Sequence, residues 1–138
     1  MANENIPGAF CPVFHKSVEL IGRRWTGAII RAMRFGHVRF SDISDAVPGL
    51  HDRLLSERLK ELEHEGVVER TVIPETPVRI EYHLTTKGTA LYAALDAIAD
   101  WAEEWVTVAP HEAARHRACV EAEAAVCDEI ESAELIAS

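Results

Sequence analysis

The polar residues of stretch 50–66 are the first candidates for chemistry in this chain. Arg53 can pair bidentately with O6 and N7 of a guanine, the commonest specific contact in the major groove of DNA. Glu57, four residues later, could accept from N4 of a cytosine or simply orient Arg53. Further groups able to meet base edges or phosphates are His51, Ser56 and Lys60. An ordinary amphipathic surface helix would carry the same pattern, so both interpretations stay open at this point.

A helix must present these groups. At 100° per residue, Leu59 and Leu62 lie within about 40° of Leu55, and the three form a narrow apolar stripe. Gly66 provides a stop, and a V-P-G-L turn precedes the helix, whose first turn is where a recognition helix carries its base-reading groups. Arg58 lies nearer the buried flank and is interpreted as structural. The sequence therefore predicts a helix with one buried side and one side free to touch a partner.

Cys11 is the second candidate for chemistry. Pro12 is well placed at the first position of a helix, which makes Cys11 the predicted N-cap. The positive end of the helix dipole favours the thiolate, which is the reactive form, and a protonated His15 one turn later could favour it further. An inert packed cysteine is the alternative. Cys119 and Cys127 could cross-link subunits, but we expect them to be inert.

Other catalytic chemistry finds little support. His111 and His116 stand at i and i+5, so their rings diverge by about 140° and do not form a zinc-protease pair. The sequence lacks G-x-S-x-G, a phosphate-binding loop and Cys-x-x-Cys. We therefore expect no metal, no cofactor and no enzyme activity.

The charge is unevenly distributed along the chain. The net charge is -9, yet residues 15–60 carry nine Lys/Arg against five Asp/Glu, whereas residues 61–138 carry five against seventeen. The basic segment permits one face to bind a polyanion. Three cysteines and no apolar N-terminal run favour a reducing cytosol, and no apolar stretch approaches the roughly 20 residues that span a bilayer. A cytoplasmic protein without a membrane segment is expected.

Two helices and a short strand are expected before the recognition helix. The first runs from Cys11 to Gly22, and the second from about Arg24 to Phe35. Their predicted core residues are Phe14, Val18, Ile21, Trp25, Ala28, Ile29, Ala32 and Met33. A strand at 38–40 and a two-turn helix capped by Ser41 follow, and Arg39 and Ser41 could hold a phosphate.

A hairpin and two helices are expected after it. Runs 67–73 and 78–85 read as strands, with Arg79 where a cation can reach DNA backbone or minor groove. A helix to about Val106 carries an apolar seam that must bury against something, and a second copy of the chain is the economical partner. The predicted dimer interface is Leu91, Leu95, Ile98, Ala102 and Trp105. A last acidic helix, 111 to about 130, carries the stripe Cys119, Ala122, Val126 and Ile130.

Together these elements predict a mainly α fold with a small β-hairpin wing. The expected parts are a flexible arm (1–10), a winged helix-turn-helix DNA-binding domain (11–88), a dimerisation helix (89–106) and an extra acidic C-terminal helix (107–138). A small-ligand pocket between core and dimer helix would be lined by Phe14, Trp25, Trp101 and Trp105, although such aromatics are more often simply core.

Several short sequence motifs extend this prediction. They are C-P-V at 11–13, L-I-G-R-R-W at 20–25, R-F-S-D-I at 39–43, V-P-G-L at 47–50, L-S-E-R-L-K-E-L-E at 55–63, G-V-V-E-R at 66–70 and V-R-I-E-Y-H-L-T-T-K-G at 78–88. Over about residues 9 to 106 the chain resembles the HxlR-type transcriptional regulators of bacteria. Arg24 stands where that family usually has Lys, and residues 107–138 exceed its usual length.

The resemblance implies a homodimeric regulator of transcription, commonly a repressor, bound to double-stranded operator DNA that we expect to be an inverted repeat. It also implies that Cys11 occupies the place of a redox- or electrophile-sensing cysteine, so an oxidant, an electrophile or a small molecule is the expected effector. The alternative is a winged-helix protein-interaction module without DNA binding. An enzyme with Cys11 as nucleophile is a more distant alternative.

Overall fold

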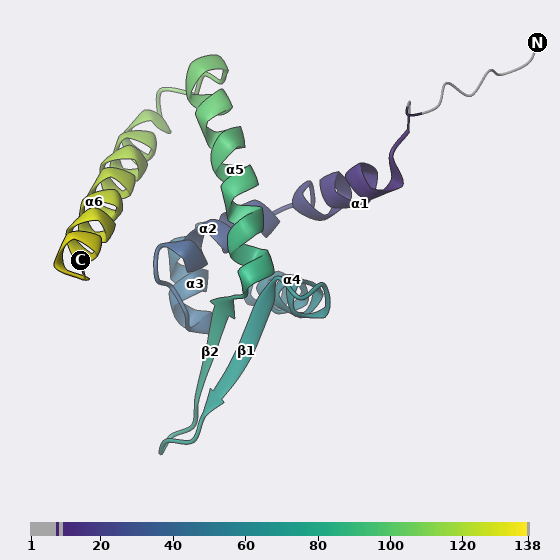
Figure 1. Ribbon diagram of the computed structural model, residues 1–138, viewed down its shortest axis with the longest axis vertical. Helices are drawn as coiled ribbons and strands as arrows, with labels where there is room; N and C mark the ends of the chain where they lie inside the picture. Colours follow the sequence, from purple (N-terminus) through teal and green to yellow (C-terminus); the bar gives the residue numbers. More distant parts are fainter. Residues whose placement is uncertain (1–7, 9, 138) are drawn as a thin grey trace, which may run out of the picture. The chain divides into compact units, whose positions relative to one another are not determined.

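The structure is a computed structural model that describes residue 8 and residues 10–137, except the side chains of residues 127, 130 and 134. Most of the predicted arm 1–10, and the side chains of Cys127 and Ile130, lie outside the described residues. In chain order the elements are α1 (Pro12–Ile21), α2 (Thr26–Arg34), α3 (Phe40–Ala46), α4 (Asp52–His64), β1 (Val68–Ile73), β2 (Arg79–Leu84), α5 (Thr86–Trp105) and α6 (Ala113–Ala137) (Figure 1). The predicted mainly α fold with one antiparallel hairpin is confirmed.

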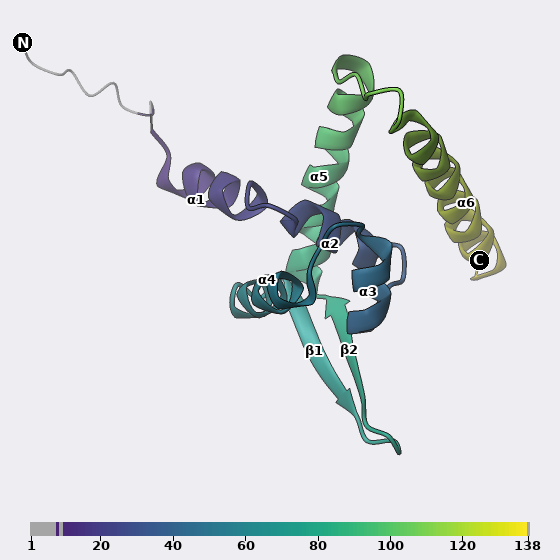
Figure 2. The same ribbon diagram turned by 180° about the vertical axis from the view of Figure 1, so that it is seen from behind.

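The chain is divided into two compact units, which are residues 1–95 and residues 96–138. In the first unit, α2, α3 and α4 gather around the start of α5, and the β1–β2 hairpin extends away from these helices (Figures 1 and 2). The hairpin pairs Val68 with Leu84 at its base and Ile73 with Arg79 near its tip. This arrangement is the helix-turn-helix with a wing that the sequence predicts.

The core of the first unit lies on the inner side of α4. Leu55, Leu59 and Leu62 are each at most 1% exposed, so the predicted apolar stripe is confirmed. Fully burying such a side chain contributes about 1.5–3 kcal/mol, so the stripe holds α4 firmly against its neighbours. The other buried residues of this core include Ile29, Ile30, Met33, Ile43, Val67 and Val68.

The start of α5 is fixed to the backbone just before β1 by a cap and a close approach. Thr85 caps the helix, since its Oγ1 accepts from the Gly88 amide at 3.1 Å and donates to the Gly66 carbonyl oxygen. Gly88 is buried, and a Cβ there would lie 2.1 Å from the Val67 carbonyl oxygen. Only glycine allows α5 to begin so close to the strand.

Three predictions about local structure are wrong. Segment 38–40 is no strand, because Phe40 already begins α3, although the Tyr82 amide donates to the Val38 carbonyl oxygen at 2.7 Å. Ser41 does not cap α3, since Arg39 holds the N-cap position and Ser41 lies inside the helix. The last helix runs to Ala137, beyond the predicted end near 130.

The apolar face of α1 is not part of the core. This helix contains no buried residue, and Phe14, which was predicted to be in the core, is 69% exposed. Val18 is exposed too, and only Leu20, at the end of the helix, packs against the core. The spacing therefore correctly marks an apolar face, but nothing within the described residues covers it.

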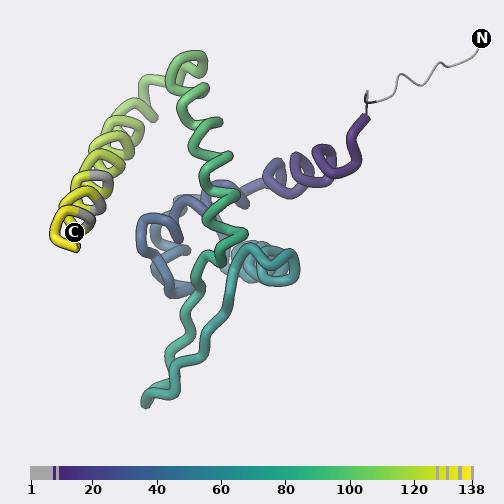
Figure 3. Tube along the Cα trace, in the orientation of Figure 1, coloured from purple at the N-terminus to yellow at the C-terminus, as the bar shows by residue number. Residues whose placement is uncertain are grey.

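The second unit contains the end of α5 and all of α6. His116 Nε2 lies 3.2 Å from Glu103 Oε2 and links the two helices. Figure 3 traces α6 as one continuous helix. Within the described part of the chain, every helix is too short or too polar to cross a membrane.

Candidate nucleic-acid interface

The outer side of α4 carries the predicted base-reading groups. The Arg53 side chain is 92% exposed, and Glu57, His51 and Lys60 are exposed as well, whereas Ser56 is half-buried. Arg53, Glu57 and Lys60 lie opposite the buried leucine stripe of the same helix, whereas Ser56 lies on its flank. The structure thus places Arg53, Glu57 and Lys60 together on one exposed surface, with the exposed His51 at the N-cap of the helix.

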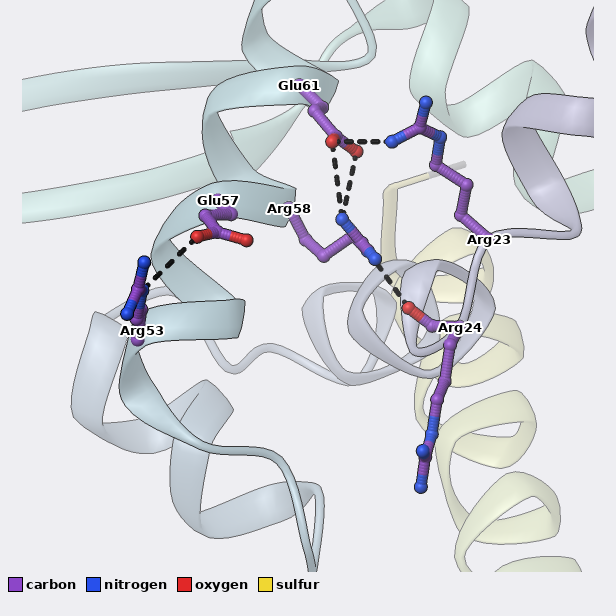
Figure 4. Close-up of polar contacts among 6 residues, drawn as sticks. All are labelled: Arg23, Arg24, Arg53, Glu57, Arg58 and Glu61. Carbon is purple, nitrogen blue, oxygen red and sulfur yellow. Dashed lines mark hydrogen bonds and ion pairs between the residues drawn. The ribbon is translucent and has the colours of Figure 1, made fainter.

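Arg53 and Glu57 form an ion pair across one helical turn, with Arg53 Nε 3.5 Å from Glu57 Oε1 (Figure 4). Exposed pairs of this kind are worth about 0–1 kcal/mol, so Arg53 can leave Glu57 for a stronger partner at little cost. The contact is compatible with the predicted orienting role of Glu57, and both this role and direct base reading stay predictions.

The entry into α4 is built by a tight turn. Gly49 has a φ of +88°, a left-handed conformation that favours glycine, and His51 occupies the N-cap without a side-chain capping hydrogen bond. Ser44 Oγ donates to Asp52 Oδ1 at 2.9 Å and ties α3 to the first turn of α4. These contacts fix where the exposed first turn begins.

One flank of α4 is joined to the α1–α2 junction by polar contacts. Arg58 Nε donates to the Arg24 carbonyl oxygen at 3.0 Å, and Arg58 Nη1 lies 3.2 Å from Glu61 Oε1. Arg23 Nη1 donates to the same carboxylate oxygen at 2.7 Å (Figure 4). The Arg58 side chain is only 15% exposed, in keeping with its interpretation as structural. Arg23 and Glu61 were not among the predicted site residues, and their only local signal is the i,i+3 spacing of Arg58 and Glu61.

The wing cation is held by two carboxylates. Arg79 Nη2 lies 3.5 Å from Glu75 Oε1, and Arg79 Nε lies 3.1 Å from Glu81 Oε1, without the alignment of a hydrogen bond. His83 Nε2 lies 2.8 Å from the other Glu81 oxygen, and this hydrogen bond, helped by the Arg79 charge, lowers the pKa of Glu81. The two carboxylates offset the charge of Arg79, and its contact with DNA stays a prediction.

Arg39 and Ser41, the predicted phosphate contacts, are both exposed at the start of α3. Their place beside α4 in sequence and fold is compatible with a backbone contact, which stays a prediction.

Cys11 occupies the predicted N-cap of α1. Its Sγ accepts from the Phe14 amide at 3.5 Å, and the thiol is exposed. His15 is engaged elsewhere, because its Nε2 lies 3.1 Å from Glu19 Oε1 and its ring stands 5.1 Å from that of Phe10. The geometry therefore offers a reagent direct access to Cys11, and His15 does not act as its base in this arrangement.

The remaining candidates are more scattered. Cys119 is half-buried on α6, and the side chain of Cys127 lies outside the described residues. Among the residues of the proposed ligand pocket, Trp25 packs against the core, whereas Phe14, Trp101 and Trp105 are exposed. The pocket stays a prediction. No cluster of three or more His, Cys, Asp or Glu suited to a metal ion occurs in the part of the chain that the structure describes.

The predicted dimer seam of α5 is divided by the structure. Leu91 and Leu95 pack partly against the core of their own unit, while Ile98 and Trp105 are exposed and Ala102 is half-buried. Trp101 is exposed beside them. An uncovered apolar stripe is therefore left on the second half of the helix.

Known proteins resemble this chain over the same elements. The HxlR-like helix-turn-helix family matches residues 20–110. YvaP of Bacillus subtilis, an uncharacterized HTH-type transcriptional regulator, is 56% identical over 96 residues, which cover 70% of this chain and 89% of YvaP. YodB of the same species, an HTH-type transcriptional regulator, is 44% identical over 95 residues, which cover 69% of this chain and 85% of YodB.

Solved structures agree with these matches. The reduced form of YodB from B. subtilis superposes with a TM-score of 0.65 at 43% identity, over 70% of this chain and 95% of YodB. The oxidized form of the redox regulator HypR gives a TM-score of 0.64 at 33% identity, over 71% of this chain and all of that chain, 100%. Cys11 and α6 lie outside the residues that match the family. The matched sequence and the relatives show that this chain belongs to the HxlR-like helix-turn-helix family of DNA-binding transcriptional regulators, which are not enzymes.

Proposed function

We propose that this regulator is a cytoplasmic repressor that binds an inverted-repeat operator as a homodimer and is released when Cys11 reacts with an oxidant or electrophile. The observation that carries the DNA-binding part is the outer side of α4, where Arg53 is 92% exposed on a helix whose leucine side is buried. Base contacts from such a helix specify sequence, while phosphate contacts fix its register.

Two uncovered apolar faces support the homodimer. One is formed on α1 by Phe14 and Val18, and the other on α5 by Ile98, Trp101 and Trp105. Exposed apolar stripes of this kind usually mark an interaction surface. In a two-fold dimer the two copies of α4 would enter successive major grooves about 34–36 Å apart, or a multiple of that.

Replacing Arg53 with alanine tests the base-reading role. We expect affinity for a duplex selected by the wild-type protein from a random pool to fall by about 1–3 kcal/mol, because a bidentate guanine contact is lost. Fluorescence anisotropy titrations at fixed salt would measure it, with Arg117→Ala on α6 as the control. Unchanged affinity for the selected duplex would exclude Arg53 as a base reader.

Replacing Cys11 with serine tests the sensing role. The thiol is exposed at a helix N-terminus, and YodB has been crystallised in reduced, diamide-treated and quinone-bound forms. We expect a quinone, to which the thiolate adds, to reduce operator binding of the wild-type protein about tenfold or more, a coupling of the usual allosteric size. The Cys11→Ser variant should keep its binding, and Cys119→Ser should respond like the wild type. A Cys11→Ser variant that still loses binding would exclude Cys11 as the sensor.

A further inference from the structure

The junction between α1 and α2 is strained and tightly held. It comprises residues 22–25 and connects a helix without buried residues to the central core helix. Trp25 has a φ of +75°, a left-handed conformation that bulky side chains rarely adopt. Such strain persists only where surrounding contacts enforce it.

Most of these contacts come from α4 and the turn before it. The Arg24 carbonyl, which belongs to the peptide bond preceding Trp25, accepts from Arg58 Nε at 3.0 Å. Trp25 Cη2 lies 3.5 Å from the position that a Cβ on Gly49 would take, so its ring packs on the turn into α4. The junction thus contacts both the turn that leads into the recognition helix and the middle of that helix.

Glu61 completes a polar cluster with Arg23, Arg24 and Arg58, which we name the α4 clamp. Its carboxylate receives Arg23 Nη1 at 2.7 Å and Arg58 Nη1 at 3.2 and 3.4 Å (Figure 4). Charge-assisted hydrogen bonds are stronger than neutral ones, and Arg58 is largely shielded from water. The Arg58 guanidinium serves a carbonyl through Nε and a carboxylate through Nη1, a division that the single ammonium of lysine does not reproduce.

The clamp lies beside the DNA-facing side of α4 and does not occupy it. At 100° per residue, Arg58 and Glu61 lie about 140° and 80° around the helix from Arg53. Burial of the leucine stripe is non-directional, so it sets the rotation of α4 about its own axis less sharply than hydrogen bonds do. Hydrogen bonds weaken steeply when they are misaligned, so the clamp opposes a change in that rotation.

We propose that Arg58 and Glu61 are positioning residues for sequence recognition, which fix the rotation of α4 by joining it to the α1–α2 junction. This inference rests on the proposed operator binding of α4. It assigns specificity to residues that need not touch DNA, because Arg53 can meet a base edge bidentately only when α4 is held at the correct rotation.

The test compares specific with random binding in conservative variants. For Arg58→Lys and Glu61→Gln, we expect affinity for the duplex selected by the wild-type protein to fall about tenfold. Affinity for a random-sequence duplex at the same salt should stay within about twofold, because the phosphate-binding face is retained. The double variant should be no worse than the poorer single variant, since both substitutions break one cluster.

Matched controls separate this role from charge and from stability. Glu63→Gln makes the same chemical change at an exposed site on α4, and Arg117→Lys does so on α6; both should leave the ratio of specific to random affinity unchanged. Thermal unfolding of each variant gives the fraction of folded protein at the assay temperature. Each affinity is then calculated from the concentration of folded protein.

Three results would overturn the inference. The first is an unchanged ratio of specific to random affinity in both clamp variants, and the second is a parallel loss of specific and random affinity. The third is wild-type affinity for the selected duplex in Arg58→Lys together with a loss in Arg58→Gln. The last would show that charge alone is needed at position 58. A wild-type protein that selects no sequence would instead remove the proposed function itself.

Discussion

Replacing Ile98 and Trp105 with aspartate should make the protein monomeric and lower its affinity for the selected operator about 100-fold or more. Both residues are exposed on the uncovered stripe of α5, where Trp105 is 67% exposed. Burying two unpaired carboxylates in an apolar interface is strongly unfavourable, so the dimer should not form. Linking two DNA-binding domains raises the affinity for a duplex with two half-sites by about 10²–10⁴ over that of one domain. The monomeric variant would lose this gain.

Sedimentation velocity and the anisotropy titration would measure the two effects on the same samples. Val120→Asp is the matched control, because Val120 is also an exposed apolar residue but lies on α6, to which no interface is assigned. It should sediment and bind like the wild type. If the double variant sedimented and bound like the wild type, the α5 stripe would not be the dimer interface.

Replacing Gly88 with alanine should destabilise the fold by about 3 kcal/mol, the upper end of what overpacking usually costs. The new Cβ would lie 2.1 Å from the Val67 carbonyl oxygen and 3.2 Å from Leu84 Cδ2. That carbonyl also accepts from the Thr85 amide at 3.1 Å, so it cannot move away without breaking the start of α5. Such a loss is a large part of a typical stability of 5–15 kcal/mol.

Gly27→Ala is the control, for which we expect a change in stability of the opposite sign. Gly27 lies in α2, and a Cβ there would meet nothing within 4 Å. Alanine should therefore stabilise the fold by about 0.5–1 kcal/mol, because it restricts the unfolded chain more than glycine does. Urea unfolding at one fixed protein concentration would compare both variants, since dimerisation makes stability depend on concentration. A Gly88→Ala variant as stable as the wild type would mean that α5 does not approach β1 so closely.

The sequence was most informative where a pattern is local. The leucine spacing of α4 places Arg53 and Glu57 on the exposed side, and Cys11 before Pro12 predicts the N-cap of α1; both agree with the structure. A helical period and a proline constraint are set by neighbouring residues, so no long-range information is needed.

The partner of an apolar face could not be predicted from its spacing. Phe14 and Val18 have the period of core residues. A helix face that packs against a second chain has the same period as a face that is buried within its own chain. For the same reason, Leu91 and Leu95 of the predicted dimer seam pack partly against their own core, while Ile98 and Trp105 do not.

Long-range polar contacts were also beyond the sequence. Arg23 and Glu61 are 38 residues apart, and no periodicity connects them. The start of α2 at Thr26, later than predicted, follows from the left-handed conformation of Trp25, which residue type alone argues against. The polar contacts of the wing, by contrast, could be predicted from the spacing. Arg79, Glu81 and His83 are two residues apart along one strand, so they lie on the same face and contact one another.

Selection of the wild-type protein against a random duplex pool tests the central claim, that α4 reads DNA in a two-fold dimer, most directly. The predicted result is an enriched inverted repeat with half-site centres about 10–10.5 base pairs apart, or a multiple of that. Its affinity should exceed that of random duplex by about 10³-fold or more. A pool that remains random after repeated selection, or an enriched single site without symmetry, would contradict the account.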